Sequence, residues 1–86
     1  MQHANQNRRS RELDLRPEFL RTLDILSAAE AAAYIRSTTS TMAKQRCYGG
    51  GPRFIRQSTR KVVYRRIDLD EWLDNRTRTT TYQAPA

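Results

Sequence analysis

Apolar residues fall into short clusters along the chain, and polar residues separate them. Residues 1–10 show no periodicity, which is typical of a segment without a fixed fold. Four apolar residues then recur at near-helical spacing: Leu15, Phe19, Leu20 and Leu23. They predict a short helix over residues 15–23, with Asp14 as its cap and Pro17 in its first turn. This helix either packs on the domain or belongs to a basic arm formed by residues 1–22.

Two helix start signals follow each other closely. Ser27, with Glu30 three residues later, has the pattern of a capping box, and the alanine-rich stretch after it predicts a helix over residues 28–35. A second signal at residues 38–41 leads into a helix that starts at Met42 and ends at Cys47 or Tyr48. Two short helices joined by about three or four residues form a helix-turn-helix.

All three glycines of the chain stand together, at Gly49–Gly51, and Pro52 follows them. Glycine accepts the left-handed conformation at a helix C-terminus, and a proline soon afterwards prevents the helix from resuming. We therefore expect the second helix to end at Gly49 and the chain to turn sharply there.

The next apolar residues predict a β-hairpin. Phe54-Ile55 and the run Val62–Tyr64 enclose a polar, cationic middle that we expect at an exposed tip. A loop centred on Thr59 pairs Phe54 with Tyr64 and Arg56 with Val62. Both faces of the ribbon carry apolar residues, so the pattern leaves open which face is buried.

A third capping pattern predicts the last helix. Asp68 has Glu71 three residues after it, so we expect Asp68 to be the cap. Leu69, Trp72 and Leu73 share one face of that helix, and we expect Trp72 and Phe54 to be the largest core residues. Residues 75–86 are rich in Thr, Arg and Pro and are assigned to an unfolded tail.

The distribution of charge along the chain adds a second property, because the chain is strongly basic. The formal net charge is +7, and residues 36–66 hold nine Lys and Arg but no acid. Such a run is either a solvated face or a surface that faces phosphate. The length of this run, 31 residues across several predicted elements, favours the phosphate-facing surface and a polyanionic partner.

Other classes of function find little support in the composition. The longest apolar stretch is far shorter than the roughly 20 residues of a membrane span, and no secretory signal pattern is visible, so we expect a cytoplasmic protein. One Cys and one His make no zinc site, and we expect Cys47 to be a buried or half-buried helix-end residue rather than a reactive thiol. The acids at residues 68–71 fit a helix start better than a catalytic pair, so we expect no enzyme, cofactor or small-molecule ligand.

The helix-turn-helix suggests a specific chemistry. An α-helix fits the major groove of DNA, and residues near the start of its second helix reach base edges. Thr39, Ser40, Ala43 and Lys44 lie on the face opposite Met42 and are the candidates for the groove. Arg46 either contacts DNA as well or has no such role, and for Thr38 a capping role is the better reading. The hairpin tip, with Arg56, Arg60 and Lys61, either lies along a DNA backbone or minor groove or is a solvated turn.

The order of four segments resembles the small winged helix-turn-helix proteins of the excisionase, or recombination directionality factor, family, which is related to AlpA-type regulators and to the DNA-binding heads of MerR proteins. The segments are ILSAAEAAAYI (25–35), STM (40–42), GPRFIR (51–56) and VVYRRIDLDEWL (62–73). The resemblance covers about residues 24–74 and is most specific in YRRIDLDEWL. Its implied fold is mainly α with a small β-hairpin, the wing.

The resemblance also implies a function: binding of double-stranded DNA beside recombination sites, often cooperatively, with DNA bending that biases an integrase toward excision of a mobile element. A transcriptional regulator is the first alternative, and a protein-interaction adaptor the second. By position, the implied DNA contacts are Thr39, Ser40, Ala43, Lys44 and Arg46 in the helix, and Arg56, Ser58, Thr59, Arg60 and Lys61 in the wing. We expect self-association on DNA, with an arm touching the next protomer.

Two residues depart from the family pattern. Arg36 stands where the family usually has the glycine of the turn, so it either adopts a positive φ, at a cost of about 1 kcal/mol, or reshapes the turn. Gln45 stands where the family usually buries a leucine. A looser second helix, or one stiffened by a partner, is expected from this exchange.

Overall fold

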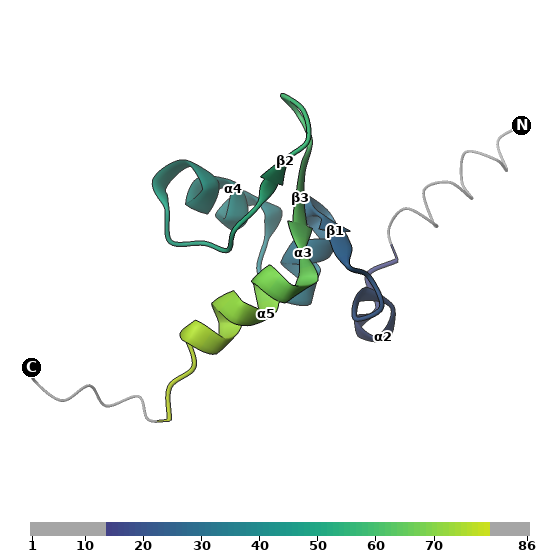
Figure 1. Ribbon diagram of the computed structural model, residues 1–86, viewed down its shortest axis with the longest axis vertical. Helices are drawn as coiled ribbons and strands as arrows, with labels where there is room; N and C mark the ends of the chain where they lie inside the picture. The colour runs from purple at the N-terminus through teal and green to yellow at the C-terminus, as the bar shows by residue number, and fades with distance from the viewer. Residues whose placement is uncertain (1–13, 80–86) are drawn as a thin grey trace, which may run out of the picture.

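The computed structural model describes residues 14–79. This part of the chain is mainly helical, with four helices and one three-stranded antiparallel sheet (Figure 1). The elements in chain order are α2 (Pro17–Leu20), β1 (Ile25–Ser27), α3 (Ala28–Tyr34), α4 (Thr39–Tyr48), β2 (Ile55–Arg56), β3 (Val62–Arg65) and α5 (Arg66–Asn75). The predicted features of residues 1–13 and 80–86 lie outside the described residues.

The first helix is shorter than predicted, and its cap prediction was wrong. α2 has only four residues, and its N-cap is Arg16, not Asp14. The carboxylate of Asp14 instead accepts hydrogen bonds of 2.7–2.8 Å from the guanidinium of Arg16. This contact holds the pKa of Asp14 below its usual value. Leu20 is fully buried in the main core cluster. The helix therefore packs on the domain, which begins before residue 24.

Two short capped helices, α3 and α4, follow each other as the capping signals predicted, but α4 begins at Thr39, three residues before the predicted Met42, because Thr38 is its cap. Ser27 and Glu30 make both bonds of the capping box at the start of α3, and Thr38 caps α4 by accepting a bond from the backbone N–H of Thr41. Arg36 takes the positive φ of 60° that the turn requires. Gly49 ends α4 with a φ of 96°.

The sheet has one strand more than predicted. In the hairpin, Arg56 pairs with Val62 as expected, but β1 also pairs with β3, which makes β3 the central strand. β1 is only three residues long and its last residue is the cap of α3. A strand this short shows no alternation in sequence, and its partner lies 38 residues away across the Leu26–Tyr64 pair.

Two further predictions, one for the last helix and one for the core, were wrong. Asp68 is not a cap: α5 already begins at Arg66, and Asp68 is a buried residue in its first turn. Phe54 is exposed and Trp72 only half-buried, so neither leads the core. The largest fully buried side chains are Tyr64, Leu20, Leu26, Met42 and Leu69.

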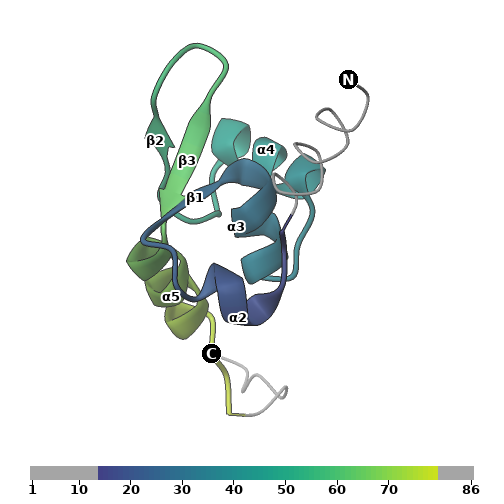
Figure 2. The same cartoon turned by 90° about the vertical axis from the view of Figure 1, so that its right-hand side faces the viewer.

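The elements divide between two ends of the molecule. α4 and the β2–β3 hairpin lie together at one end, and α2 and α5 lie at the other, in both views (Figures 1 and 2). β3 connects the two ends, because it pairs with the hairpin partner and runs directly into α5. Within residues 14–79 no helix has the length and apolar character that crossing a bilayer requires.

Candidate functional site

The start of α4 presents polar groups to solvent. Thr38 and Thr41 are engaged with each other, through the backbone bond and a 3.0 Å contact between their hydroxyls. Thr39 and Ser40 are exposed, and their hydroxyls make no hydrogen bond to residues 14–79. The first turn of α4 holds no acid, unlike the first turns of α2, α3 and α5. The positive end of the helix dipole is therefore left uncompensated there.

The other predicted residues of α4 differ in their exposure to solvent and in their hydrogen bonds. Lys44 is exposed and Ala43 is half-buried. Arg46 is half-buried, and its guanidinium donates a 2.7 Å hydrogen bond to the hydroxyl of Tyr64. Arg46 therefore ties α4 to the sheet as well as contributing charge to the surface, a contact that the sequence did not predict.

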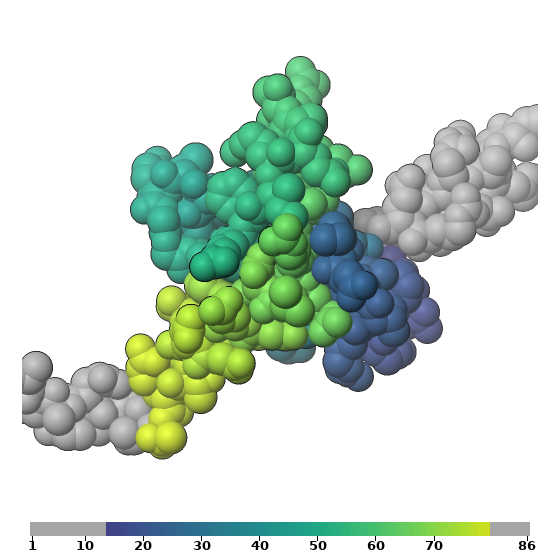
Figure 3. All heavy atoms as spheres, viewed as in Figure 1, coloured from purple at the N-terminus to yellow at the C-terminus, as the bar shows by residue number. Residues whose placement is uncertain are grey.

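The hairpin tip is ordered by its own backbone. The N–H groups of Gln57 and Ser58 both donate to the carbonyl of Lys61, at 2.9 and 3.3 Å. The N–H of Arg60 lies 3.4 Å from the hydroxyl of Ser58. All residues from Arg56 to Lys61 are exposed, so every predicted wing residue is accessible, and the hairpin stands as a ridge beside α4 (Figure 3).

A contact with Trp72 of α5 holds the link between α4 and the hairpin, residues 49–54, in place. The indole N–H of Trp72 donates a 3.1 Å hydrogen bond to the carbonyl of Gly50, and the guanidinium of Arg76 lies 4.7 Å above the centre of the indole. Gly51 lies so close to Gln45 that a Cβ at position 51 would come within 2.7 Å of the Cβ of Gln45. These contacts fix the path of the chain from α4 to β2.

Most cations of the acid-free run have no carboxylate partner in the described part of the chain. Of its nine, only Arg65 and Arg66 form salt bridges within residues 14–79, with Asp68, Asp24 and Asp70. The seven others make none with that part of the chain: Arg36, Lys44, Arg46, Arg53, Arg56, Arg60 and Lys61. All of these except Arg36, which lies in the turn between α3 and α4, belong to α4, the hairpin or the link between them. The end of the molecule that carries α4 and the hairpin is therefore strongly positive.

Sequence reasoning missed two residues of this surface and misjudged a third. Arg53 is exposed between α4 and β2, and its place in the acid-free run was the available signal. Tyr48 is 87% exposed at the end of α4, although its aromatic ring suggests burial. Cys47 is exposed rather than buried or half-buried as expected.

Groups of three or more His, Cys, Asp or Glu that could hold a metal ion do not occur between residues 14 and 79. A scan of protein-family models and a search of curated proteins give no match to this chain.

Proposed function

We propose that the protein is a winged helix-turn-helix that binds double-stranded DNA, with α4 in the major groove and the β2–β3 hairpin as the wing. The observation that carries this proposal is the shared position of α4 and the hairpin at one end of the molecule, where six cations lack carboxylate partners within residues 14–79. A surface with this charge attracts phosphate, and no acid along residues 36–66 opposes it.

The dimensions of α4 suit this role. Ten residues make a helix about 15 Å long and about 10–12 Å wide with its side chains, and the major groove is about 12 Å wide. The free hydroxyls of Thr39 and Ser40 stand at the end that would enter first, where they can donate to or accept from base edges. Lys44 lies one turn further along and can reach guanine or phosphate.

The wing has a different task from the helix. Arg60 and Lys61 stand at an exposed tip, and cations in such a position contact the phosphate backbone or enter a minor groove. Backbone contacts position a protein on DNA without reading its sequence. The helix is thus the element that selects a sequence, and the wing adds affinity for all sequences.

We propose further that the protein acts architecturally, as an excisionase-like factor that binds cooperatively at adjacent sites and biases an integrase toward excision. Its support is the resemblance over residues 24–74. A transcriptional regulator would use the same DNA contacts, so binding data do not separate the two. An excision assay with the cognate integrase does, because only the architectural factor changes the ratio of excision to integration.

DNA binding is tested by fluorescence anisotropy with labelled duplexes from the region flanking the gene, over a series of salt concentrations. The affinity should fall steeply with salt, with a slope of about −0.9 for each phosphate contact. Lys44→Ala should weaken binding to the preferred duplex more than to a random one. Arg60→Ala should weaken both alike and make the salt slope shallower by about 0.9.

Arg78→Ala is the matched control, because it removes one exposed cation beyond the C-terminus of α5, away from the hairpin. It should leave the affinity and the slope nearly unchanged. If all three variants lost the same DNA affinity, net charge alone would explain the binding, and the proposed interface would be refuted. Absence of salt-dependent DNA binding would favour a protein-interaction adaptor.

A further inference from the structure

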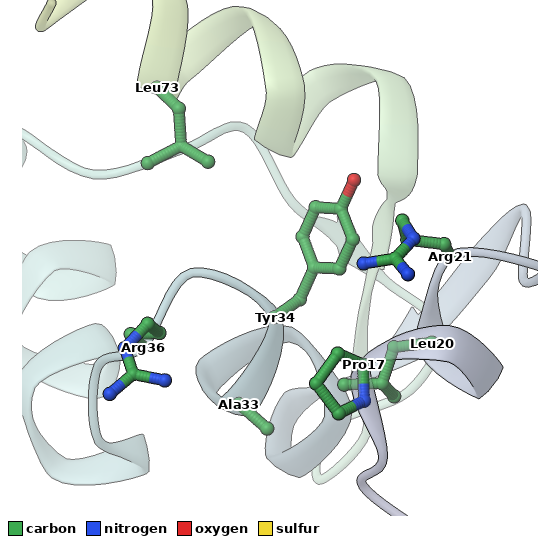
Figure 4. A pocket seen from close by; sticks show the side chains of 7 residues that line it. All are labelled: Pro17, Leu20, Arg21, Ala33, Tyr34, Arg36 and Leu73. Carbon is green, nitrogen blue, oxygen red and sulfur yellow. The ribbon is translucent and has the colours of Figure 1, made fainter.

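A second surface lies at the end of the molecule opposite the hairpin. A pocket of about 350 Å³ opens between α2, the end of α3 and α5. Its lining is mostly apolar, with Pro17, Ala33 and Leu73 among its residues, and the guanidiniums of Arg21 and Arg36 stand on either side (Figure 4). It shares no residue with α4 or the hairpin.

The two arginines define what the pocket can hold. Both are exposed, and neither forms a salt bridge with any of residues 14–79. An apolar side chain can enter the pocket, and carboxylates beside it would meet the guanidiniums in charge-assisted hydrogen bonds. The fitting occupant is therefore an acidic helix face with one protruding aliphatic side chain.

The chain carries such a face itself. Ile67, Glu71 and Asp74 lie at positions i, i+4 and i+7 of α5, which is one stripe of a helix, and they stand on the side opposite the fully buried Leu69. Ile67 is 64% exposed. Glu71 and Asp74 are exposed as well, and within the described part of the chain they form no salt bridge.

We propose that a second copy of this chain inserts Ile67 of its α5 into the pocket, so that its Glu71 and Asp74 face Arg21 and Arg36. On α5, Leu73 of the pocket and Ile67 of the stripe are six residues apart, so they point about 120° away from each other around the helix. One copy cannot satisfy its own pocket with its own stripe. Each copy then offers one pocket and one stripe, and the contact is heterologous and repeats into a chain.

This contact is a means of self-association separate from the arm, and it leaves α4 and the hairpin free. One helix stripe in one pocket is smaller than a standard interface of about 1,200–2,000 Å². The association is accordingly weak in free solution, and the associated fraction of the protein increases with its concentration. It is independent of DNA binding, so failure of either proposal leaves the other standing.

The experiment is sedimentation equilibrium without DNA, over a wide range of protein concentrations. Wild-type protein should show a weight-average mass that rises steadily with concentration. The double charge reversal Arg21→Glu/Arg36→Glu makes the pocket repel the stripe, and Glu71→Arg/Asp74→Arg makes the stripe repel the pocket. Each variant alone should associate at least about tenfold more weakly, because like charges are brought together.

Mixing the two variants gives the decisive result. In the mixture each altered pocket meets an altered stripe of opposite charge, and each unaltered pocket meets an unaltered stripe, so association should return. Arg60→Glu/Lys61→Glu is the control: it removes as much charge as the pocket variant but alters the hairpin tip, and it should associate like wild type. Circular dichroism confirms that each variant is folded.

Two results would overturn the proposal. The first is a wild-type protein that stays monomeric at every concentration. The second is a mixture that associates no better than its separate components, which would show that the pocket and the stripe do not meet.

Discussion

Gly51→Ala tests the close approach between the glycine turn and α4. Gly49 and Gly50 have positive φ angles, whereas Gly51 has not, so backbone conformation does not require glycine there. Lack of space requires glycine at position 51, because an added Cβ would lie 2.7 Å from the Cβ and 2.9 Å from the Oε1 of Gln45. The Oε1 can rotate away, but the Cβ is fixed to the helix backbone. The turn or the end of α4 must therefore shift.

Overpacking of this kind costs about 1–3 kcal/mol, and in a domain of this size about 1 kcal/mol lowers Tm by roughly 4–8 °C. Urea and thermal unfolding measure the loss. Gly50→Ala is the comparison variant, because a Cβ there meets nothing within 4 Å and its cost of about 1–2 kcal/mol comes from the positive φ alone.

A double-mutant cycle with Gln45→Gly separates the two causes. Gln45→Gly removes the obstructing Cβ, at a propensity cost of its own of roughly 1 kcal/mol. Gly51→Ala should then be nearly harmless in the Gln45→Gly background, while Gly50→Ala should cost the same in both. If the effects of Gly51→Ala and Gln45→Gly simply add, the close-contact explanation is wrong.

Three further predictions concern single contacts. Trp72→Phe keeps an aromatic ring but loses the hydrogen bond to Gly50, so it should lower the free energy of unfolding by about 0.5–1.5 kcal/mol in urea titrations; an unchanged value would contradict the role given to that bond. Arg36→Gly relieves a positive φ and should raise the free energy of unfolding by about 0.5–1 kcal/mol after the extra entropy of glycine is subtracted, whereas a lower Tm would contradict it. Burial first, and the hydrogen bond to Asp70 second, raise the pKa of Tyr34 above 10.0. Since the unfolded chain then releases this proton at lower pH than the folded one, wild type should lose stability as the pH rises above about 10. Tyr34→Phe should lose less over that range, and parallel pH profiles would refute the assignment.

The local features of the fold were predictable because their causes are local. A capping box needs only Ser27 and Glu30, three residues apart, and a helix end needs only a glycine such as Gly49. The hairpin register followed from two short apolar runs around a polar middle. The exposed wing residues and the exposed Thr39, Ser40 and Lys44 were predictable for the same reason, since each position depends on the element that carries it.

Contacts between distant segments were not predictable in this way. β1 exists because Leu26 meets Tyr64, and three residues alone carry no strand pattern. Asp68 has the spacing of a cap, but β3 runs directly into α5, so the helix begins at Arg66, three residues earlier than a cap at Asp68 would place it. Arg46 was expected on the free surface, and its bond to Tyr64 depends on how α4 crosses the sheet.

The sequence by itself determined the two capped helices, the glycine turn, the cationic hairpin and the absence of acids along residues 36–66. These depend on spacing, propensity and charge within a few residues. Only the tertiary structure decided which side chains fill the core, and that α4 and the hairpin share one end of the molecule. Burial and proximity are set by packing between segments far apart in the chain, and no local pattern encodes them.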